Sequence, residues 1–257
     1  MILLLVWGLL ATSQASGIHE PERPTHSWTS PFLDDLFFRR ISGNLVGDPG
    51  AAVTANPTLQ VSFNLQGLER IASSHPELAD AVRVLRRLRV PGANAFVVSV
   101  QATPPQSASS GAERDGRNGR APPRAGLFGS GAEADDRLAV TKAAPSAPRA
   151  QLVPYQMSVL YLQVPSDIVG GAFVAQGLPP EASPVRVQPS ENGLLTFRGD
   201  LAHHVEPFFA ASGRAVVALV IEFYVVPEAR YSEVRPWGCR AGCGDDGTKR
   251  RVGKVLR

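Results

Sequence analysis

Two neighbouring histidines and a later arginine are the residues of this chain whose types and spacing suggest chemistry. His203 and His204 stand in the stretch LAHHVEPF, between two segments that read as strands. An imidazole held at a strand end is a good ligand for a transition metal, although such pairs are also common among exposed loop residues. Arg214 opens the apolar run AVVALVIEFYVV. If its charge is buried there, it needs a carboxylate partner, whereas an arginine that snorkels at the strand end needs none.

The region that carries these residues has the pattern of β-structure. From Tyr155 onward, short apolar runs alternate with turns that contain Gly, Pro, Asn or Ser. The predicted strands cover residues 157–163, 172–175, 185–187, 194–197 and 215–226. Several short strands with this punctuation indicate a β-sandwich or barrel.

Two helices and two further strands are predicted upstream of this region. The helices cover residues 31–40 and 76–90, and the strands cover residues 57–68 and 94–100. In the second helix, Pro76 stands in the first turn and arginines gather near the end, as the helix dipole favours. We therefore expect a mostly β fold with supporting N-terminal α-helices.

The composition and the N-terminal segment help to define which part of the chain forms the folded region. The chain has 257 residues and a net charge of +3, and its 24 glycines and 22 prolines indicate many turns. Residues 1–15 contain the apolar run ILLLVWGLL followed by small residues, which is typical of a signal peptide. This predicts the secretory pathway, meaning the endoplasmic reticulum lumen or the cell exterior. We expect a linker and a short helix over 16–56 and the main domain over 57–227.

Two segments are predicted to lack a fixed structure. Residues 102–150 are rich in Pro, Ser, Ala, Gly and Arg, which predicts a disordered insertion or a very long loop. Residues 228–257 carry eight Lys or Arg and four acidic residues, which predicts a basic flexible tail. No aromatic residue follows Trp237, which argues against stacking on nucleic acid bases. No apolar run reaches the length of a membrane span, and two cysteines exclude a disulfide-rich scaffold.

Three motifs of the C-terminal half, taken together, resemble a known family. Their order is MSVLYLQVPSDIVGG, then NGLLTFRGDLAHHVEPF, then Gly213-Arg214 before the apolar strand. This combination resembles the Fe(II)/2-oxoglutarate-dependent dioxygenases, in the branch of the prolyl 4-hydroxylases. The resemblance implies a double-stranded β-helix, or jelly roll, and covers about residues 94–226.

The resemblance also implies a set of site residues. The frame H-x-V-x-P favours His203 as the distal metal ligand, whereas the ten-residue spacing to Arg214 favours His204, and we choose His203. Arg214 is then expected to bind the far carboxylate of 2-oxoglutarate. Many relatives carry a hydroxyl two residues later, where this chain has Val216, so Tyr161 is a candidate for that hydrogen bond. The implied cofactors are Fe(II), 2-oxoglutarate and ascorbate, with dioxygen as cosubstrate.

The upstream half of the family motif departs from the usual pattern. The family carries its first histidine and its carboxylate as H-x-D, but this chain has no histidine between His75 and His203. The stretch AEADDRLAV fits by position, with Asp135 as the carboxylate and Glu133 in place of the histidine. Carboxylates are hard oxygen ligands, so a Glu/Asp/His set is chemically possible for Fe(II).

Three classes of function therefore stay open. The first is a dioxygenase that hydroxylates a protein or small-molecule substrate and releases succinate and CO₂, with iron held by Glu133, Asp135 and His203. The second is a catalytically inactive relative that serves as a binding or scaffold module, which the glutamate at 133 favours. The third is an unrelated secreted β-sandwich that binds carbohydrate, against which the motif spacing argues. Iron binding separates the first two.

Overall fold

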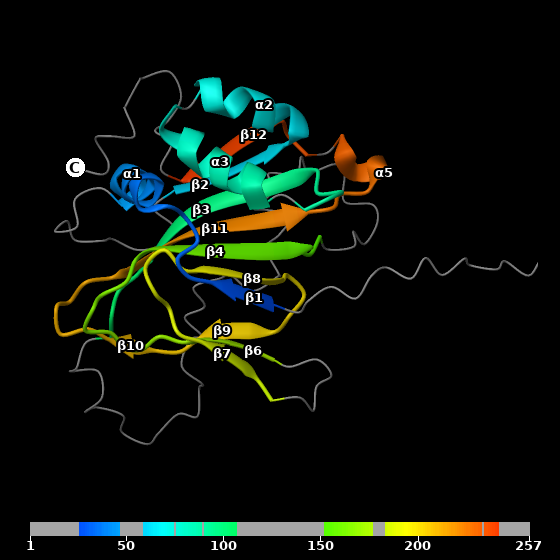
Figure 1. The fold of residues 1–257 in the computed structure, drawn as a ribbon. Coiled ribbons are helices and arrows are strands. Elements are labelled where there is room, and N and C mark those ends of the chain that lie inside the picture. The colour runs from blue at the N-terminus through cyan, green and yellow to red at the C-terminus, as the bar shows by residue number, and fades with distance from the viewer. Residues whose placement is uncertain are drawn as a thin grey trace, which may run out of the picture.

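The computed structural model describes residues 26–46, 59–74, 76–88, 90–106, 152–176, 183–232 and 234–241 (Figure 1). The predicted signal peptide, most of the predicted insertion, and the last part of the predicted tail lie outside these residues. Glu133 and Asp135 also lie outside them.

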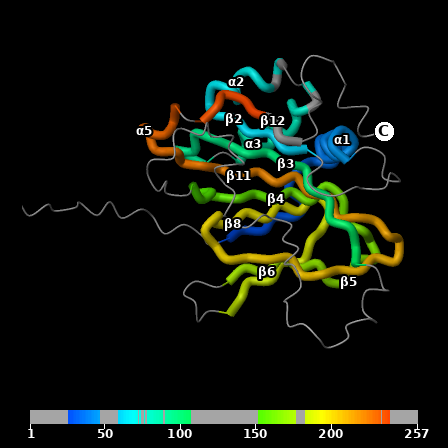
Figure 2. The backbone as a smooth tube through the Cα atoms, turned by 180° about the vertical axis from the view of Figure 1, so that it is seen from behind, coloured from blue at the N-terminus to red at the C-terminus, as the bar shows by residue number. Residues whose placement is uncertain are grey.

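A seven-stranded antiparallel sheet forms the centre of the molecule, in the order β1-β8-β4-β11-β3-β2-β12. Its strands are β1 (His26–Thr29), β2 (Leu59–Asn64), β3 (Ala95–Thr103), β4 (Gln156–Gln163), β8 (Leu194–Arg198), β11 (Val216–Tyr224) and β12 (Trp237–Ala241). Strand β11 lies between β3 and β4, as the view from behind also shows (Figure 2). Every residue of β11 is buried, which explains why its sequence is apolar apart from Glu222 and Tyr224.

A second, smaller layer of strands lies on one side of the main sheet. It consists of the three-stranded sheet β7-β6-β9 and the pair β10-β5. The bounds are β5 (Val169–Gly170), β6 (Phe173–Ala175), β7 (Val185–Val187), β9 (His203–Val205) and β10 (Phe208–Phe209). Apolar side chains of both layers form one buried cluster, which we call the inner cluster, and which includes Met157, Val159, Tyr161, Phe173, Phe197, Phe208, Val216, Ala218 and Val220. Two layers of antiparallel strands around a shared core confirm the predicted mostly β, jelly-roll fold with helical support.

Helices cover the opposite face of the main sheet. They are α1 (Asp35–Val46), α2 (Leu65–Ser74) and α3 (Ala79–Leu88), the last preceded by the 3₁₀ turn η1 (Pro76–Leu78). Figure 1 shows them gathered on the side of the molecule away from β6, β7 and β9. Their apolar residues join those of the sheet in a second core. No helix in the described part of the chain is long and apolar enough to cross a membrane.

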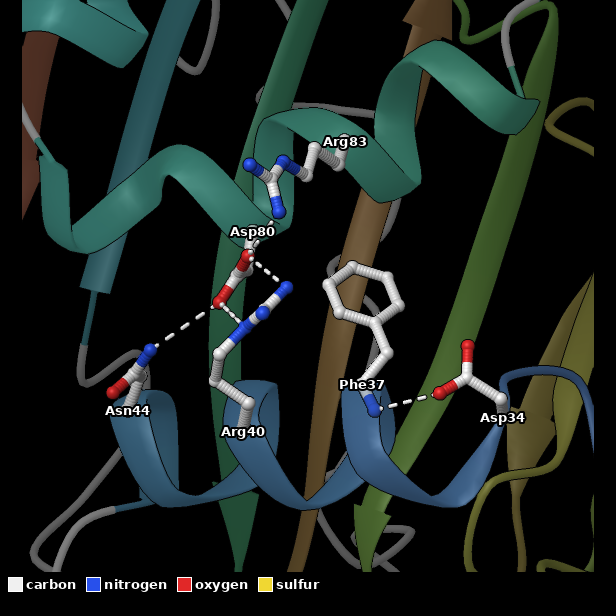
Figure 3. Close-up of polar contacts among 6 residues, drawn as sticks. All are labelled: Asp34, Phe37, Arg40, Asn44, Asp80 and Arg83. Carbon is white, nitrogen blue, oxygen red and sulfur yellow. Dashed lines mark hydrogen bonds and ion pairs between the residues drawn. The ribbon is translucent and has the colours of Figure 1, made fainter.

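A buried carboxylate joins α1 to α3 (Figure 3). Asp80 is 8% exposed and accepts hydrogen bonds from Arg40 Nε at 2.9 Å and Arg40 Nη2 at 3.0 Å. Asn44 and Arg83 also donate to this carboxylate, at 3.3 and 3.5 Å. The two-pronged pair with Arg40 sets the distance between the helices, because planar guanidinium and carboxylate groups match in geometry.

The N-terminal part of the fold departs from the predicted linker. Strand β1 pairs with β8 within the segment predicted as linker, and α1 begins at Asp35 and ends at Val46 rather than spanning 31–40. Asn192, whose φ is 58°, holds the segment around Leu33 in place. Its side chain accepts from Leu33 N at 2.9 Å and donates to Leu33 O at 2.7 Å. A long-range contact of this kind leaves no local sequence pattern.

The predicted boundaries at 102 and 228 also need correction. Strand β3 continues to Thr103, so the first residues of the predicted insertion belong to the sheet. The predicted flexible tail begins with α5 (Glu228–Tyr231) and continues into β12, which pairs with β2. The half-buried Trp237 packs against the helical core there. Pairing gives the otherwise open edge of β2 a partner, which favours order over a free tail.

Candidate functional site

Strand β9 turns its two histidines to opposite faces of the second sheet. His203 pairs with Ala175 and His204 with Val174 of β6. Because side chains alternate along a strand, His203 faces inward with the buried Ala175, and His204 is exposed. His203 is therefore the histidine that faces the interior between the two layers of strands.

The ring of His203 is fixed from three directions. Its Nδ1 lies 2.7 Å from the carbonyl oxygen of Leu201. Its ring centroid lies 5.6 Å from that of Phe173 and 4.8 Å from that of Phe197. A hydrogen bond at Nδ1 selects the tautomer in which Nδ1 carries the proton and Nε2 has the lone pair.

The outer neighbour His204 belongs to a polar cluster on the surface. Arg186 donates to both carboxylate oxygens of Glu206, one at 2.9 Å from Nε. This hydrogen bonding, with smaller contributions from the charges of Arg186 and His204, holds the pKa of Glu206 below its ordinary value. The arrangement is an exposed ion pair beside a histidine, and it does not face the interior.

Tyr161 lies in the middle of β4 and faces the inner cluster. It is 2% exposed, and its ring packs edge-on against Trp28 of β1 with centroids 6.1 Å apart. Burial raises the pKa of its hydroxyl. The group therefore stays protonated at neutral pH and acts as a hydrogen-bond donor.

Arg214 is exposed, which corrects the idea that its charge is buried and needs an anion. It precedes β11, and its Nη2 donates to Oε1 of Gln163 at 3.2 Å. Gln163 is buried and donates in turn to the carbonyl oxygen of Ala215 at 2.9 Å. Water can solvate such a guanidinium. The cation remains accessible at the end of the inner cluster, where β11 begins at Val216.

The turn before Arg214 is held by an acidic residue. Asp167 accepts from the Ser212 backbone N–H at 2.6 Å and from its hydroxyl at 2.9 Å. These hydrogen bonds lower the pKa of the Asp167 carboxyl. They connect the turn after β4 to the turn before β11 and so fix the approach of Arg214.

Polar residues of β3 share the interior with these groups, and sequence reasoning missed them. Ser99, Gln101 and Thr103 pair with Val220, Ala218 and Val216 of β11. Paired residues of an antiparallel ladder share a face, so all three lie on the side of the inner cluster. The alternation of apolar and polar residues along residues 95–103 was the available signal, but by itself it describes any strand with one solvated face.

A buried carboxylate also lies on this face. Glu222 of β11 is 1% exposed, pairs with Met157, and accepts a hydrogen bond from the hydroxyl of Tyr224. A single carboxylate within an otherwise apolar run was the available signal, and sequence reasoning missed it. The interior thus contains the imidazole of His203 near Met157 and Phe197, and the hydroxyl and amide groups of β3 further along the strands.

The described residues do not by themselves form an iron site. His203 is a suitable nitrogen ligand, but no group of three His, Cys, Asp or Glu side chains lies together within the described ranges. A facial triad needs two further ligands, and the predicted ones, Glu133 and Asp135, lie outside the described residues. The metal roles predicted for these three residues stay predictions.

A cavity of about 650 Å³ lies elsewhere, where α2 begins and α5 meets the sheet. Its lining includes Asn64, Asn94, Glu228 and Tyr231. The two asparagines already bond to backbone groups, for example Asn64 Oδ1 to Gln66 N at 3.0 Å and Asn94 Nδ2 to Val226 O at 2.8 Å. Among the described motif residues, His203, His204, Arg214 and Tyr161 do not line this cavity.

Comparison with known proteins finds distant likenesses of fold. No family model and no curated protein matches the chain. A prolyl-4-hydroxylase from Pseudomonas putida is 15% identical, with a TM-score of 0.40, over 79% of this chain and 94% of the other. A collagen prolyl hydroxylase from Paramecium Bursaria Chlorella virus-1 is 13% identical, with a TM-score of 0.43, over 84% and 100%. An oxidoreductase of the 2OG-Fe(II) oxygenase family from Burkholderia pseudomallei is 9% identical, with a TM-score of 0.40, over 80% and 88%.

Proposed function

We propose that this chain is an Fe(II)/2-oxoglutarate-dependent dioxygenase that hydroxylates a protein or small-molecule substrate in the secretory pathway. The observation that carries the proposal is the inward position of His203 on β9. The H-x-V-x-P frame selects the same residue. If the two histidines were only surface residues, the residue that this frame selects would not be expected to face the inside of the fold.

The chain's own residues have separable roles in this proposal. His203 contributes one ligand of the metal, and Glu133 and Asp135 complete the set. Arg214 offers a cation to the far carboxylate of 2-oxoglutarate, and Tyr161 offers a protonated hydroxyl. Gln163 holds the guanidinium at 3.2 Å. The apolar inner cluster surrounds Tyr161 and excludes water there, which strengthens a hydrogen bond made by its hydroxyl. When bound, Fe(II) supplies the activation of dioxygen.

A second candidate function is an iron-free module that still binds a carboxylate ligand. It is favoured by the glutamate at 133 and by the single inward imidazole among the groups discussed above. The two candidate functions use the same interior of the fold and differ in whether a metal is bound there. Iron binding and turnover therefore decide between them.

The deciding experiment measures succinate formed from 2-oxoglutarate by the full chain with Fe(II) and ascorbate. Four proteins are compared: the parent, His203→Ala, His204→Ala and Glu133→His. His204→Ala is the matched control, because it removes an imidazole from the same strand on the exposed face. We expect turnover in the parent and in His204→Ala, and its loss in His203→Ala.

Other outcomes change the assignment. Turnover that appears only in Glu133→His means that the scaffold is competent and the natural chain is the iron-free module. Turnover that survives His203→Ala but not His204→Ala contradicts the assignment of the inward histidine. Silence in all four folded proteins contradicts the dioxygenase proposal.

A further inference from the structure

The cavity at the start of α2 has space for a small ligand and lies apart from the proposed metal site. Its volume of about 650 Å³ falls in the range of small-molecule sites. It lies where β2 ends and α2 begins, and Figure 1 shows α5 at this end of the main sheet. None of the described residues that line it belongs to the inner cluster. A ligand of this cavity is therefore independent of the groups around His203.

The first three backbone N–H groups of α2, at the edge of the cavity, already have acceptors. Leu65 N donates to the carbonyl oxygen of Asn94 at 3.2 Å. Gln66 N and Gly67 N both donate to Oδ1 of Asn64, at 3.0 and 3.1 Å. An anion would need free donors at this helix end, so the geometry argues against an anionic ligand.

A carboxylate without a protein partner lines the same cavity. Among the described residues of the lining, Glu228 alone carries a charge. It is exposed, and no hydrogen bond or ion pair joins its carboxylate to another described residue. Tyr231, three residues later on α5, also lines the cavity and is half-buried. Residues three apart share a helix face, so the carboxylate and the aromatic ring lie side by side.

A flat organic cation matches this pair of side chains. A guanidinium group donates two parallel hydrogen bonds to a carboxylate and stacks on an aromatic ring, which a compact ammonium does less well. Ser232 and Gln66 add an exposed hydroxyl and an exposed amide that accept further hydrogen bonds. Val234 is buried in the wall of the cavity and offers an apolar surface to the alkyl stem that carries the cation.

We propose that this cavity binds an alkylguanidinium group, the chemistry of an arginine side chain, with Glu228 and Tyr231 as its main contacts. The site goes beyond the proposed function and does not depend on it. An arginine within a polypeptide and a free small molecule both present this group, and the ligands of the test separate the two sources.

The test is a ligand-observed NMR titration of the full chain at low salt, where screening of charges is weak. N-acetyl-arginine-N-methylamide represents an arginine within a polypeptide, and butylguanidinium represents a free alkylguanidinium. N-acetyl-citrulline-N-methylamide has nearly the same shape and no charge. Comparison of the arginine and citrulline compounds on the parent chain tests the role of charge without any substitution.

Five variants test the residues of the cavity. Glu228→Gln removes the charge, Tyr231→Leu removes the ring but keeps an apolar side chain, and Tyr231→Phe keeps the ring. Gln66→Trp fills the cavity from an exposed position. Glu69→Gln is the matched control, because Glu69 is a carboxylate of α2 that is 75% exposed and does not line the cavity. Thermal unfolding of each ligand-free variant checks that it is folded.

We expect the parent to bind the arginine compound at least about tenfold more tightly than the citrulline compound. Glu228→Gln should weaken binding of the arginine compound about tenfold, as loss of a hydrogen bond to a charged group does. Tyr231→Leu should weaken it about threefold, the scale of an exposed cation–π contact. Tyr231→Phe and Glu69→Gln should bind like the parent, and Gln66→Trp should not bind.

The remaining outcomes identify the source of the ligand or overturn the inference. Butylguanidinium that binds as tightly as the arginine compound supports the site and assigns it to a free ligand, whereas weaker binding assigns it to a polypeptide. Equal binding of the citrulline compound, an equal loss in Glu69→Gln, or unchanged binding in Gln66→Trp overturns the inference. Absence of binding to the folded parent also overturns it, and the succinate assay of the same parent tests the proposed function separately.

Discussion

His203 and His204 are consecutive residues of β9 that lie on opposite faces of the second sheet. His203 packs between Phe173 and Phe197 in the interior, and His204 is exposed beside the pair of Arg186 and Glu206. Two imidazoles of identical chemistry are therefore placed in different surroundings by the alternation of a strand. This pair offers an internal control for every experiment on the metal.

Loss of the inward imidazole should weaken metal binding, whereas loss of the outward one should not. We expect His203→Ala to raise the dissociation constant for Mn(II) by at least about tenfold, on the scale at which metal-site substitutions act. His204→Ala should stay within about twofold. Electron paramagnetic resonance of free Mn(II) measures both. His203→Phe keeps a ring between the two phenylalanines, so a loss of Mn(II) affinity in that variant is due to the missing imidazole nitrogen. Equal affinity for Mn(II) in all variants would place the metal elsewhere.

Removal of the Asp80 carboxylate should loosen the helical layer. Asp80→Ala deletes two hydrogen bonds from Arg40, one from Asn44 and the longer contact from Arg83. We expect the free energy of unfolding to fall by about 1–3 kcal/mol, measured by urea denaturation. Arg83→Ala is the matched control, because its 3.5 Å contact is made by a side chain that is 64% exposed. That variant should lose less than about 1 kcal/mol, and an equal loss would contradict the assigned importance of the Arg40 pair.

Two helical glycines should respond in opposite directions to substitution by alanine. A Cβ at Gly67 would lie 1.6 Å from the carbonyl oxygen of Pro236, so α2 and the segment leading into β12 must separate. Gly67→Ala should lower the free energy of unfolding by about 1–3 kcal/mol. A Cβ at Gly43 of α1 meets nothing within 4 Å, so Gly43→Ala should raise it by about 0.5–1 kcal/mol.

Thermal denaturation of both glycine variants checks these signs. Proteolysis of Gly67→Ala adds a local readout, because release of the C-terminal strand should expose the chain after Tyr231 to cleavage. A Gly67→Ala protein as stable and as resistant as the parent would mean that β12 is not held against α2 and β2 as described.

Acid should weaken the turn that precedes Arg214. Hydrogen bonds from Ser212 lower the pKa of Asp167 in the folded state. The ionised carboxylate therefore stabilises the fold above its unfolded pKa of about 4, and this contribution is lost as the pH falls through the lower folded value. Asp167→Asn lacks the contribution, so its melting temperature should fall less than the parent's between pH 6 and pH 3. An identical fall in both proteins would contradict the role of this carboxylate.

The positions of several strands were readable from local patterns. Apolar runs with Gly, Pro and Asn turns located β4, β8 and β11, because backbone pairing and turn chemistry act on neighbouring residues. The motif spacing selected His203 and Arg214 as candidates, and Asn192-Gly193 marked a turn that the structure contains. The helix over 76–90 was also recognisable, since amphipathic periodicity and an early proline are local signals.

What the tertiary structure decided is how distant segments meet. Pairing of β9 with β6 determined which histidine faces inward, and pairing of β11 with β3 placed Thr103 across from Val216. Gln163 at the end of β4 bonds to the exposed Arg214, and pairing with the edge of β2 gives β12 its place in the sheet. None of these relations has a local pattern, because strand register depends on the free energy of burying whole faces at once, over separations that no sequence window spans.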